Sequence, residues 1–381
     1  MTRILVTGAR APAALHLAKL LSDGGATVLA ADCIRWPLTR GADFVEVTLR
    51  HPPPATHSAE FRAWLENTIA AHNIDLVVPS CEEVLHLAQA MTALGLQHKL
   101  YASGIDQLQQ MHSKYDFIEG MRKLGFSVPS TTLIESSSDL KALGAQVHDL
   151  VLKPVWSRFA DRVLIRPNLD DLKGISPTES DPWVAQEILE GQEVCIYAVG
   201  AQGKLGAWVA YRPTIRVGQG AGIHFTPVDD PLIADFLNKF FEATRWTGQV
   251  SFDVFLTPAG DLRPIECNPR ATSGIHFMAH GPEFLKAMKG IASEAKEDVK
   301  PLQITDAMLI FGLPSALRNS EYTAWRQAWK EAQDATLYSS AGARRIMKAA
   351  CFAELAWGAI KDRKSLLAGS TQGIEWGGAR S

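Results

Sequence analysis

The sequence lacks long apolar runs, paired cysteines and a strong excess of charge of either sign. No stretch reaches the roughly 18 consecutive apolar residues that a transmembrane helix needs, so we expect no membrane partner. A formal net charge of -3 over 381 residues provides no general attraction to nucleic acid, whose binding depends on clustered Lys and Arg. Both partner classes are therefore excluded from the expected function.

The five cysteines are scattered and odd in number, and no Cys-x-x-Cys pair occurs. This excludes the usual zinc and dithiol motifs and fits a reducing compartment. Near the start of the chain, Gly8, Arg10 and Lys19 interrupt the apolar run that a signal-peptide core would need. We therefore expect a cytoplasmic protein.

The composition itself is that of an ordinary globular protein, with 46% hydrophobic and 21% charged residues. A chain of 381 residues is too long for one ordinary core, so its length predicts two or three lobes. Several lobes make a cleft between them available for a ligand.

The first hundred residues alternate short apolar strands with helices. The pattern predicts strands at 3–7, 27–31 and 75–79, with helices at 13–24 and 81–94. Ser80 is placed to cap the second of these helices. Strands separated by helices predict a parallel sheet covered on both faces, and hence a Rossmann-like lobe over residues 1–105.

Asp32 ends the second strand, where the ribose-binding acid of a Rossmann dehydrogenase would lie. The first turn, residues 8–13, reads Gly-Ala-Arg-Ala-Pro-Ala and lacks the second and third glycines of the dinucleotide fingerprint. We therefore favour a lobe without a bound nucleotide, and keep a nicotinamide oxidoreductase as a third-ranked alternative.

The middle of the chain predicts two further units. A helical stretch at 103–125 carries Lys114, and strands at 150–155, 162–165 and 183–188 with a helical stretch from Leu169 form a small α+β unit. Strands at 193–199, 206–211, 248–256 and 262–267 suit an antiparallel sheet. We assign one domain to 106–300, with a lid at about 126–186. Residues 301–381 are mostly helical, including a helix at 344–357, and we assign them no chemistry.

Residues 251–270 are the most informative segment, because two apolar strands are joined there by a turn at 258–261. A loop of two or four residues would place Thr257 opposite Leu262. A loop of three residues would shift this register. A solvent-exposed hairpin without a ligand is the alternative interpretation.

Counting outward from that pair places Asp253 directly opposite Glu266, with Cβ atoms about 4.5–5.5 Å apart. Like charges at such a position destabilise the sheet, so a cation is expected between them. Asn268 shares a strand face with Glu266 and adds a neutral oxygen. This oxygen set suits Mg²⁺ bound together with a nucleotide, with Mn²⁺ as an alternative. Arg270 follows and is placed to meet phosphate.

The motif Glu-Cys-Asn-Pro-Arg at residues 266–270 resembles the end of the second half of ATP-grasp enzymes. The resemblance extends over about residues 1–300, with the best match to the branch of carbamoyl-phosphate synthetase halves, biotin carboxylase and amino-acid ligases. It implies a Rossmann-like pre-ATP-grasp lobe followed by a two-subdomain ATP-grasp fold. The motif is specific for the superfamily and says little about the substrate.

The resemblance also implies roles for individual residues. Asp253, Glu266 and Asn268 match the Mg²⁺ ligands, and Arg270 matches the residue that steadies the transferred phosphoryl group. Lys153 and Lys114 match the two lysines on the ATP phosphates. The hinge residues that would hold adenine and ribose are Gln186, Glu187, Leu189 and Glu193.

One segment departs from the family pattern. The family has a glycine-rich loop after the strand lysine, whereas residues 155–162 read Val-Trp-Ser-Arg-Phe-Ala-Asp-Arg. Arg158 and Arg162 could replace its backbone donors, because guanidinium groups suit phosphate.

The resemblance implies an ADP-forming ligase that phosphorylates a small carboxylate and joins the acyl phosphate to an amine. Alternatives are an enzyme acting on bicarbonate, like carbamoyl-phosphate synthetase or a carboxylase, and a non-catalytic ATP-binding protein. A homodimer is left open. Weaker substrate candidates are Arg216, Ser273, His276 and the triplet Cys81-Glu82-Glu83, which lies at the ligand edge of the first sheet.

Overall fold

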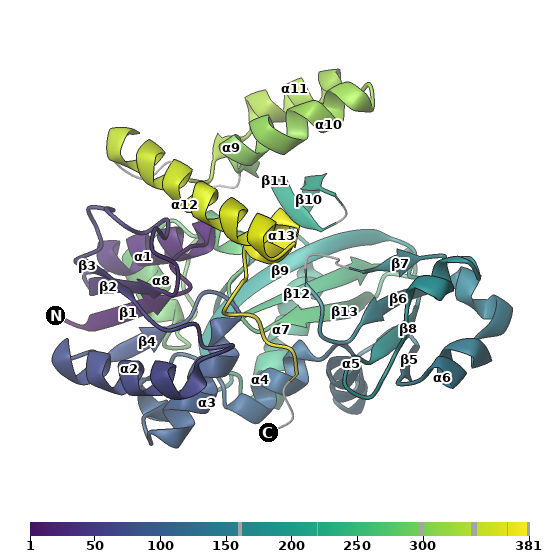
Figure 1. Ribbon diagram of the computed structural model, residues 1–381, viewed down its shortest axis with the longest axis horizontal. Coiled ribbons are helices and arrows are strands. Elements are labelled where there is room, and N and C mark those ends of the chain that lie inside the picture. The colour runs from purple at the N-terminus through teal and green to yellow at the C-terminus, as the bar shows by residue number, and fades with distance from the viewer. Residues whose placement is uncertain (159–161, 219, 297–299, 337–340, 364, 379–381) are drawn as a thin grey trace.

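The computed structural model describes the chain except for residues 159–161, 219, 297–299, 337–340, 364 and 379–381. The described strands form three sheets, with a seven-stranded sheet between two four-stranded ones (Figure 1). Among the described residues, no helix combines the length and hydropathy that crossing a bilayer requires. The expected mixed α/β fold is confirmed.

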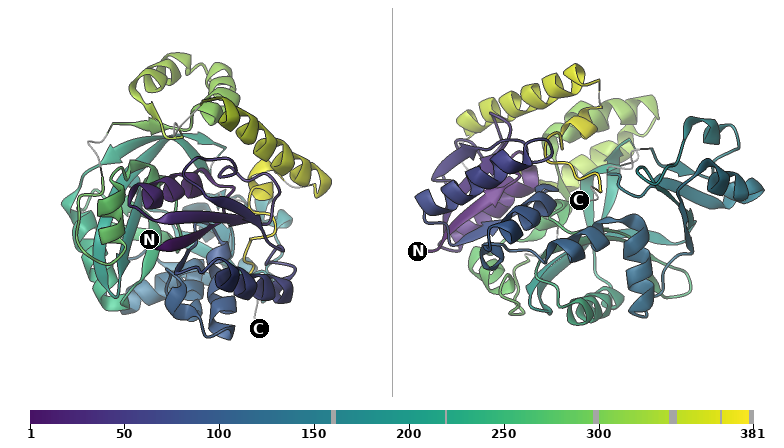
Figure 2. Two further views of the ribbon diagram at one scale, coloured as in Figure 1. Left: turned by 90° about the vertical axis from the view of Figure 1, so that its left-hand side faces the viewer. Right: turned by 60° about the horizontal axis from the view of Figure 1, so that its bottom comes forward.

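The first sheet is parallel, with strand order β3-β2-β1-β4. Its elements are β1 (Arg3–Thr7), α1 (Pro12–Asp23), β2 (Thr27–Asp32), β3 (Val47–Arg50), α2 (Ser58–Ala71), β4 (Leu76–Val78) and α3 (Glu83–Ala93). Alternate side chains of β1 enter different cores, because successive residues of a strand point to opposite faces. Ile4 and Val6 join the core that includes α1, whereas Leu5 joins the core that includes α2 and α3. The sheet is thus covered on both faces, as the right-hand view of Figure 2 shows.

Ser80 does not cap α3, so that prediction is wrong. Its hydroxyl donates instead to the carbonyl of Thr7 at 2.7 Å, and α3 begins at Glu83. The Glu83 carboxylate accepts hydrogen bonds from the Ser80 amide and the Thr7 hydroxyl. Gly8 lies against these hydrogen-bonded side chains with a φ of +68°, and a Cβ there would be 2.6 Å from the Ser80 hydroxyl oxygen. The tight first turn therefore needs glycine for both conformation and space.

The lid sheet has the strand order β5-β8-β6-β7 and its own small core. Its elements are β5 (Thr131–Ile134), α6 (Ser137–Ala142), η2 (Gly144–Asp149), β6 (Leu150–Pro154), β7 (Leu164–Ile165), η3 (Asp171–Gly174) and β8 (Trp183–Glu187). The helical stretch expected from Leu169 is only the short 3₁₀ turn η3. In Figure 1 this sheet lies at the opposite end of the molecule from β1 to β4.

The central sheet has the order β13-β12-β9-β10-β11-β14-β15. Its elements are β9 (Gln192–Ala201), β10 (Lys204–Val217), β11 (Ala221–Val228), α7 (Pro231–Thr244), β12 (Gly248–Leu256), β13 (Leu262–Asn268), η4 (Ser273–Phe277), α8 (Gly281–Ala287), β14 (Leu302–Gln303) and β15 (Gln333–Asp334). The expected antiparallel run from β9 to β13 is present, and the sequence pattern missed β11. Phe236, Phe240 and Phe241 of α7 belong to the core that also holds Val250 and Phe252 of β12.

The helical stretch expected at 103–125 is two helices. After η1 (Gln97–Lys99) come α4 (Ile105–His112) and α5 (Lys114–Lys123), separated at Ser113. The Ser113 hydroxyl accepts a hydrogen bond from the Asp116 amide and so caps α5. Because of this break, Lys114 begins a helix and lies buried against Val155, just after the lid strand β6, rather than on an exposed helix face.

The rest of the described chain is mostly helical: α9 (Thr305–Ala307), the π-helix η5 (Met308–Gly312), α10 (Leu313–Arg318), α11 (Tyr322–Glu331), α12 (Ala341–Lys361) and α13 (Leu366–Gly369). Residues 370–378, called the strap below, then run past the carboxyl edge of the first sheet (Figures 1 and 2). The boundaries proposed at 105 and 300 and the lid proposed at about 126–186 remain predictions, and the sheet of β5 to β8 is called the lid sheet after that prediction.

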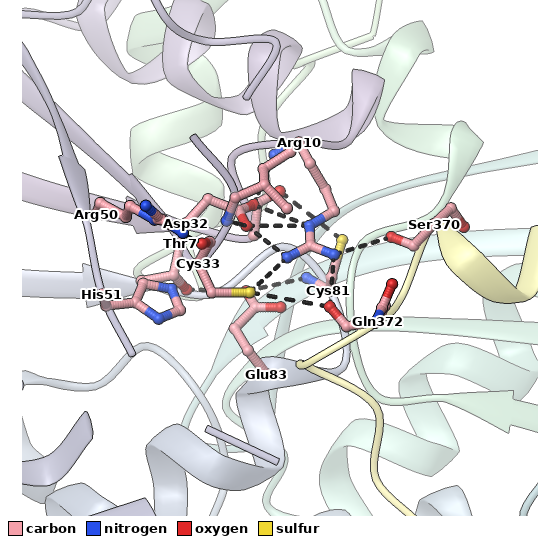
Figure 3. A network of polar contacts seen from close by, with 12 residues as sticks. Thr7, Arg10, Asp32, Cys33, Arg50, His51, Cys81, Glu83, Ser370 and Gln372 are labelled. Carbon is pink, nitrogen blue, oxygen red and sulfur yellow. Dashed lines mark hydrogen bonds and ion pairs between the residues drawn. The ribbon is translucent and has the colours of Figure 1, made fainter. Parts of the chain in front are cut away.

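A buried ion pair lies at the carboxyl edge of the first sheet. The Arg10 guanidinium is 2.6 Å from the Asp32 carboxylate, and both side chains are almost fully buried. The Arg10 amide also donates to Asp32, and the strap carbonyls of Ser370 and Gln372 accept from the guanidinium (Figure 3). Asp32 is thus already occupied by a cation where a dehydrogenase would bind ribose, which argues against the oxidoreductase alternative.

We expect Arg10→Met to lower the free energy of unfolding by about 3–5 kcal/mol, because it leaves the buried Asp32 carboxylate without its cation. The double variant Arg10→Met/Asp32→Asn should recover part of that loss. Urea unfolding measures both. Lys19→Met breaks an exposed pair with Asp23 and should change stability by at most about 0.5 kcal/mol. Equal losses for the single and double variants would contradict this account.

Candidate active site

The hairpin of β12 and β13 brings Asp253 directly opposite Glu266, as predicted. The turn that leads there is different from the expected one. Thr257 bonds through its amide to the carbonyl of Asp261, which leaves a loop of three residues, and Leu256 rather than Thr257 pairs with Leu262.

A β-bulge restores the expected pairing. Val254 pairs with Pro264 and Asp253 pairs with Glu266, so Ile265 is an extra residue on β13. The three-residue loop and the bulge shift the register by one residue each, in opposite directions, and the two shifts cancel. The facing acids are therefore maintained by a distortion of β13 that the turn sequence does not reveal.

The two carboxylates have different charge environments. Burial and the neighbouring Glu266 charge raise the pKa of Asp253 from 3.8 to about 6. Burial acts in the same direction on Glu266, but Lys114 and Lys153 outweigh it and hold the pKa of Glu266 below its usual range. One acid of the pair is thus stabilised as an anion, whereas the other carries the cost of the repulsion.

Two lysines approach Glu266 from different elements. Lys114 Nζ lies 3.5 Å from the Glu266 carboxylate and donates to the carbonyl of Ser157 at 2.6 Å. Lys153 Nζ, on β6, lies 3.4 Å from the carbonyl of Ile265. Burial lowers the pKa of Lys153 to about 8 despite the nearby Glu266 charge. Both predicted phosphate lysines thus converge with the predicted metal ligands.

Arg270 and Asn268 complete this end of the site. The Arg270 guanidinium donates to the side-chain oxygen of Asn268 at 3.2 Å and to the carbonyl of Ala271 at 3.1 Å. Its Nε atom is buried without a hydrogen-bond partner in the described part of the chain. A buried guanidinium N–H that lacks an acceptor is suited to an anionic group of a ligand.

The donor set fits a hard divalent cation. It comprises the carboxylates of Asp253 and Glu266 and the side-chain oxygen of Asn268, and Mg²⁺ prefers such oxygens together with phosphate and water. Among the described residues, no group of three or more His, Cys, Asp or Glu side chains is arranged to hold a metal ion.

The predicted hinge residues lie at the border of the lid sheet. Gln186 donates to the Thr131 hydroxyl within this sheet, and the Glu187 amide donates to the carbonyl of Ser130. The N–H of Leu189, just beyond β8, has no hydrogen bond to any described residue. It can therefore donate to a ligand at this edge.

Glu193 and Arg216 meet each other, although the sequence assigned them to different ligands. Their side chains form an ion pair of 2.7 Å, with 37% and 27% of the side-chain surface exposed. The Glu193 and Arg216 charges both influence the pKa of Asp253, so this pair lies near the predicted metal ligands. A ribose or an acceptor that used either residue would have to compete with the pair.

Ser273 and His276 lie on η4, just beyond Arg270. His276 is buried, and its ring packs edge-on against His16 of α1 at a centroid separation of 5.3 Å. Burial lowers the pKa of His276 well below its usual value, with a further contribution from His16. His276 thus packs η4 against α1, and the substrate role proposed for it and for Ser273 stays a prediction.

Both arginines of the lid loop, Arg158 and Arg162, form ion pairs within the protein. Arg158 Nε lies 2.7 Å from the Glu82 carboxylate, and Arg162 pairs with Asp181 at 2.8 Å. Phe159, Ala160 and Asp161 of the same loop lie outside the described residues. The structure places Arg158 against the first lobe, which the sequence could not indicate.

His112, the last residue of α4, also lies at the site, although the sequence pattern did not single it out. Its ring is buried, and its Nε2 atom has no hydrogen-bond partner among the described residues. Burial lowers the pKa of His112 to about 4, against the opposing effect of Glu82. The helix break at Ser113 is the only local signal that could have pointed to this position.

Comparison with solved structures identifies the fold. The chain is similar to N5-carboxyaminoimidazole synthetase from Staphylococcus aureus, with 16% identity, a TM-score of 0.60, and coverage of 84% of this chain and 86% of that one. It is also similar to L-amino acid ligase from Bacillus licheniformis, with 13% identity, a TM-score of 0.63 and 79% coverage of both chains.

A third similar structure is the biotin carboxylase domain of 2-oxoglutarate carboxylase from Hydrogenobacter thermophilus, in complex with MgADP and bicarbonate. It has 11% identity, a TM-score of 0.59, and coverage of 79% of this chain and 73% of that one. No protein-family model and no curated protein matches the chain. The structural likenesses show that the chain has the ATP-grasp fold.

We expect Asp253→Asn to stabilise the protein in the absence of metal and nucleotide, by about 1–2 kcal/mol at pH 8. The raised pKa of Asp253 means that its ionised form destabilises the folded state above about pH 6, so the gain should shrink as the pH falls toward 4.

Urea unfolding at pH 8 and pH 5 measures this gain. Asp235→Asn, on the exposed face of α7, is the matched control and should change little. A variant less stable than the wild type at pH 8 would show that the acids do not repel.

Proposed function

We propose that the chain is an ADP-forming ligase that uses Mg²⁺-ATP to phosphorylate a small carboxylate and joins the acyl phosphate to an amine. The observation that carries this proposal is the convergence of two facing acids, two buried lysines and Arg270 between the central sheet and the lid. That arrangement supplies oxygens for a metal and cations for a polyphosphate within one site.

Each residue has a distinct part in this reaction. Asp253, Glu266 and Asn268 would hold Mg²⁺, which neutralises phosphate charge when bound. Lys114 and Lys153 bind the phosphates and, because both lie near Glu266, keep them beside the metal ligands. Arg270 presents its unpartnered Nε–H to the transferred phosphoryl group and compensates the charge that develops on it.

The likenesses support a carboxylate acceptor without selecting one. One similar structure is an amino-acid ligase, and another contains bicarbonate. A bicarbonate-activating enzyme stays the alternative, and a non-catalytic ATP-binding protein is favoured only by the glycine-poor lid loop.

We expect ADP, and no AMP, when the protein is incubated with Mg²⁺-ATP and pools of amino acids and other small carboxylates. Glu266→Gln should lower turnover at least 100-fold, since one metal ligand loses its charge. Coupled ADP detection and chromatography of the nucleotides measure both. AMP formation would contradict acyl-phosphate chemistry, and tight ATP binding without turnover in any pool would favour the non-catalytic alternative.

MgADP should stabilise the folded protein by about 2.7 kcal/mol when its concentration is 100 times its dissociation constant. We expect Lys153→Met to weaken MgADP binding at least 10-fold, because the buried ammonium pairs with phosphate. Calorimetric titration measures the affinity, and Lys123→Met, on the exposed side of α5, is the control. Unchanged affinity in Lys153→Met would remove this lysine from the phosphate site.

A further inference from the structure

The strap, residues 370–378, connects two parts of the molecule that are distant in sequence. In Figures 1 and 2 it leaves α13 and runs over the carboxyl edge of the first sheet toward the base of the lid. Ile374 and Trp376 of the strap are buried, with 1% and 3% exposure. The segment is therefore packed as part of the interior and does not lie loosely on the surface.

On one side the strap is bound to the first lobe through its backbone. The Arg10 guanidinium donates to the carbonyl of Gln372 at 2.9 Å (Figure 3), and the Ala55 amide donates to the carbonyl of Gly373 at 3.1 Å. The ring of His86 bonds the carbonyl of Glu375 at 3.0 Å. Backbone carbonyls make all three contacts, so they depend on the course of the strap more than on its side chains.

On its other side the strap is bound to the lid loop. Arg158 donates through Nη2 to the carbonyl of Trp376 at 2.9 Å and through Nε to the Glu82 carboxylate at 2.7 Å. The Trp376 amide donates to the same carboxylate at 3.3 Å. Arg158, Glu82 and Trp376 thus form a closed ring of three hydrogen bonds between lid, first lobe and strap.

The same part of the lid is also held by α5. The Lys114 amide donates to the carbonyl of Val155 at 3.4 Å, and Lys114 Nζ donates to the carbonyl of Ser157 at 2.6 Å. The strap also packs closely against this region, because a Cβ on Gly378 would lie 2.4 Å from the Trp156 indole. Residues 155–158 are therefore fixed from two sides.

The ring of three hydrogen bonds lies near two of the buried polar atoms that lack hydrogen-bond partners among the described residues. Burial alone would raise the pKa of Glu82, but the His112, Arg158 and Arg270 side chains lower it. The His112 ring also packs against the Trp156 indole of the lid loop at a centroid separation of 5.8 Å. His112 Nε2 and Arg270 Nε are both buried and without hydrogen-bond partners among the described residues. Two such atoms beside one carboxylate indicate a place where a polar ligand group completes the hydrogen bonds.

We propose that the strap is a positioning element for the acceptor side of the active site. It holds Arg158 on Glu82, and this bridge fixes Glu82 relative to His112, beside which the acceptor carboxylate binds, next to the phosphoryl group that Arg270 holds. The strap's role in acceptor binding rests on the proposed ligase function, whereas its hydrogen-bonded connection to the lid does not. Arg158 is thus a positioning residue and does not contact the ATP phosphates.

Hydrogen–deuterium exchange on the full-length protein tests the coupling without any substrate. Arg158→Met should speed exchange of the Trp376 amide at least 10-fold, because its acceptor Glu82 loses the guanidinium that holds it. Gly378→Val, which pushes the strap away from Trp156, should speed exchange at residues 155–158. The control is Arg166→Met, an exposed lid arginine that is 3.8 Å from Asp149. Unchanged strap exchange in Arg158→Met would overturn the proposal.

Steady-state kinetics then test the role in catalysis. We expect Arg158→Met to lower kcat/KM for the acceptor at least 10-fold while the KM for ATP changes less than twofold, and Arg158→Lys to recover part of the loss. An equal effect on the KM for ATP would place Arg158 on the phosphates and overturn the proposal. If the wild type shows no turnover, the ligase proposal fails, and the exchange experiment still decides whether the strap holds the lid.

Discussion

The repulsion between Asp253 and Glu266 is the constraint around which the site is arranged. Two buried carboxylates opposite each other on neighbouring strands cost free energy, and the surrounding residues reduce that cost unequally. Lys114 and Lys153 stabilise Glu266 as an anion, whereas Asp253 remains destabilised. A divalent cation would relieve the remaining repulsion. The facing carboxylates, which lower the stability of the protein without bound metal, would therefore favour binding of metal and nucleotide.

The cations that act on this pair come from separate parts of the fold. Lys114 begins α5, Lys153 lies on the lid strand β6, and Arg270 follows β13. Their convergence requires that the lid sheet be held close to the central sheet. Lys114 contributes directly, because its ammonium contacts both Glu266 and the carbonyl of Ser157 in the lid loop. Closure of the lid and charge balance are therefore coupled through a single side chain.

The lid loop, residues 155–162, contains no glycine, and its base is held by contacts with other parts of the fold. Here the base of the loop is fixed by hydrogen bonds from α5 and by the ring of Arg158, Glu82 and Trp376. A glycine-rich loop can close over phosphates because its backbone is unrestricted, whereas this loop is restrained at its base. The restraint involves the strap, a segment to which the sequence pattern assigned no function.

The sequence by itself determined the alternation of β1, α1 and β2, the antiparallel run of β9 to β13, and the motif from Glu266 to Arg270. These features depend on local periodicity and on residue types at short spacing, which a sequence displays directly. It also predicted that Asp253 faces Glu266, although from a turn that does not form. The bulge at Ile265 that restores this pairing could not be predicted, because it depends on the pairing of whole strands.

Only the tertiary structure decided which charges meet. Arg10 with Asp32, Glu193 with Arg216, and Arg158 with Glu82 are separated by 22, 23 and 76 residues. The strap is more distant still, since Trp376 reaches Glu82 across 294 residues. Such contacts arise from the packing of lobes against one another, and no periodicity in the sequence records them.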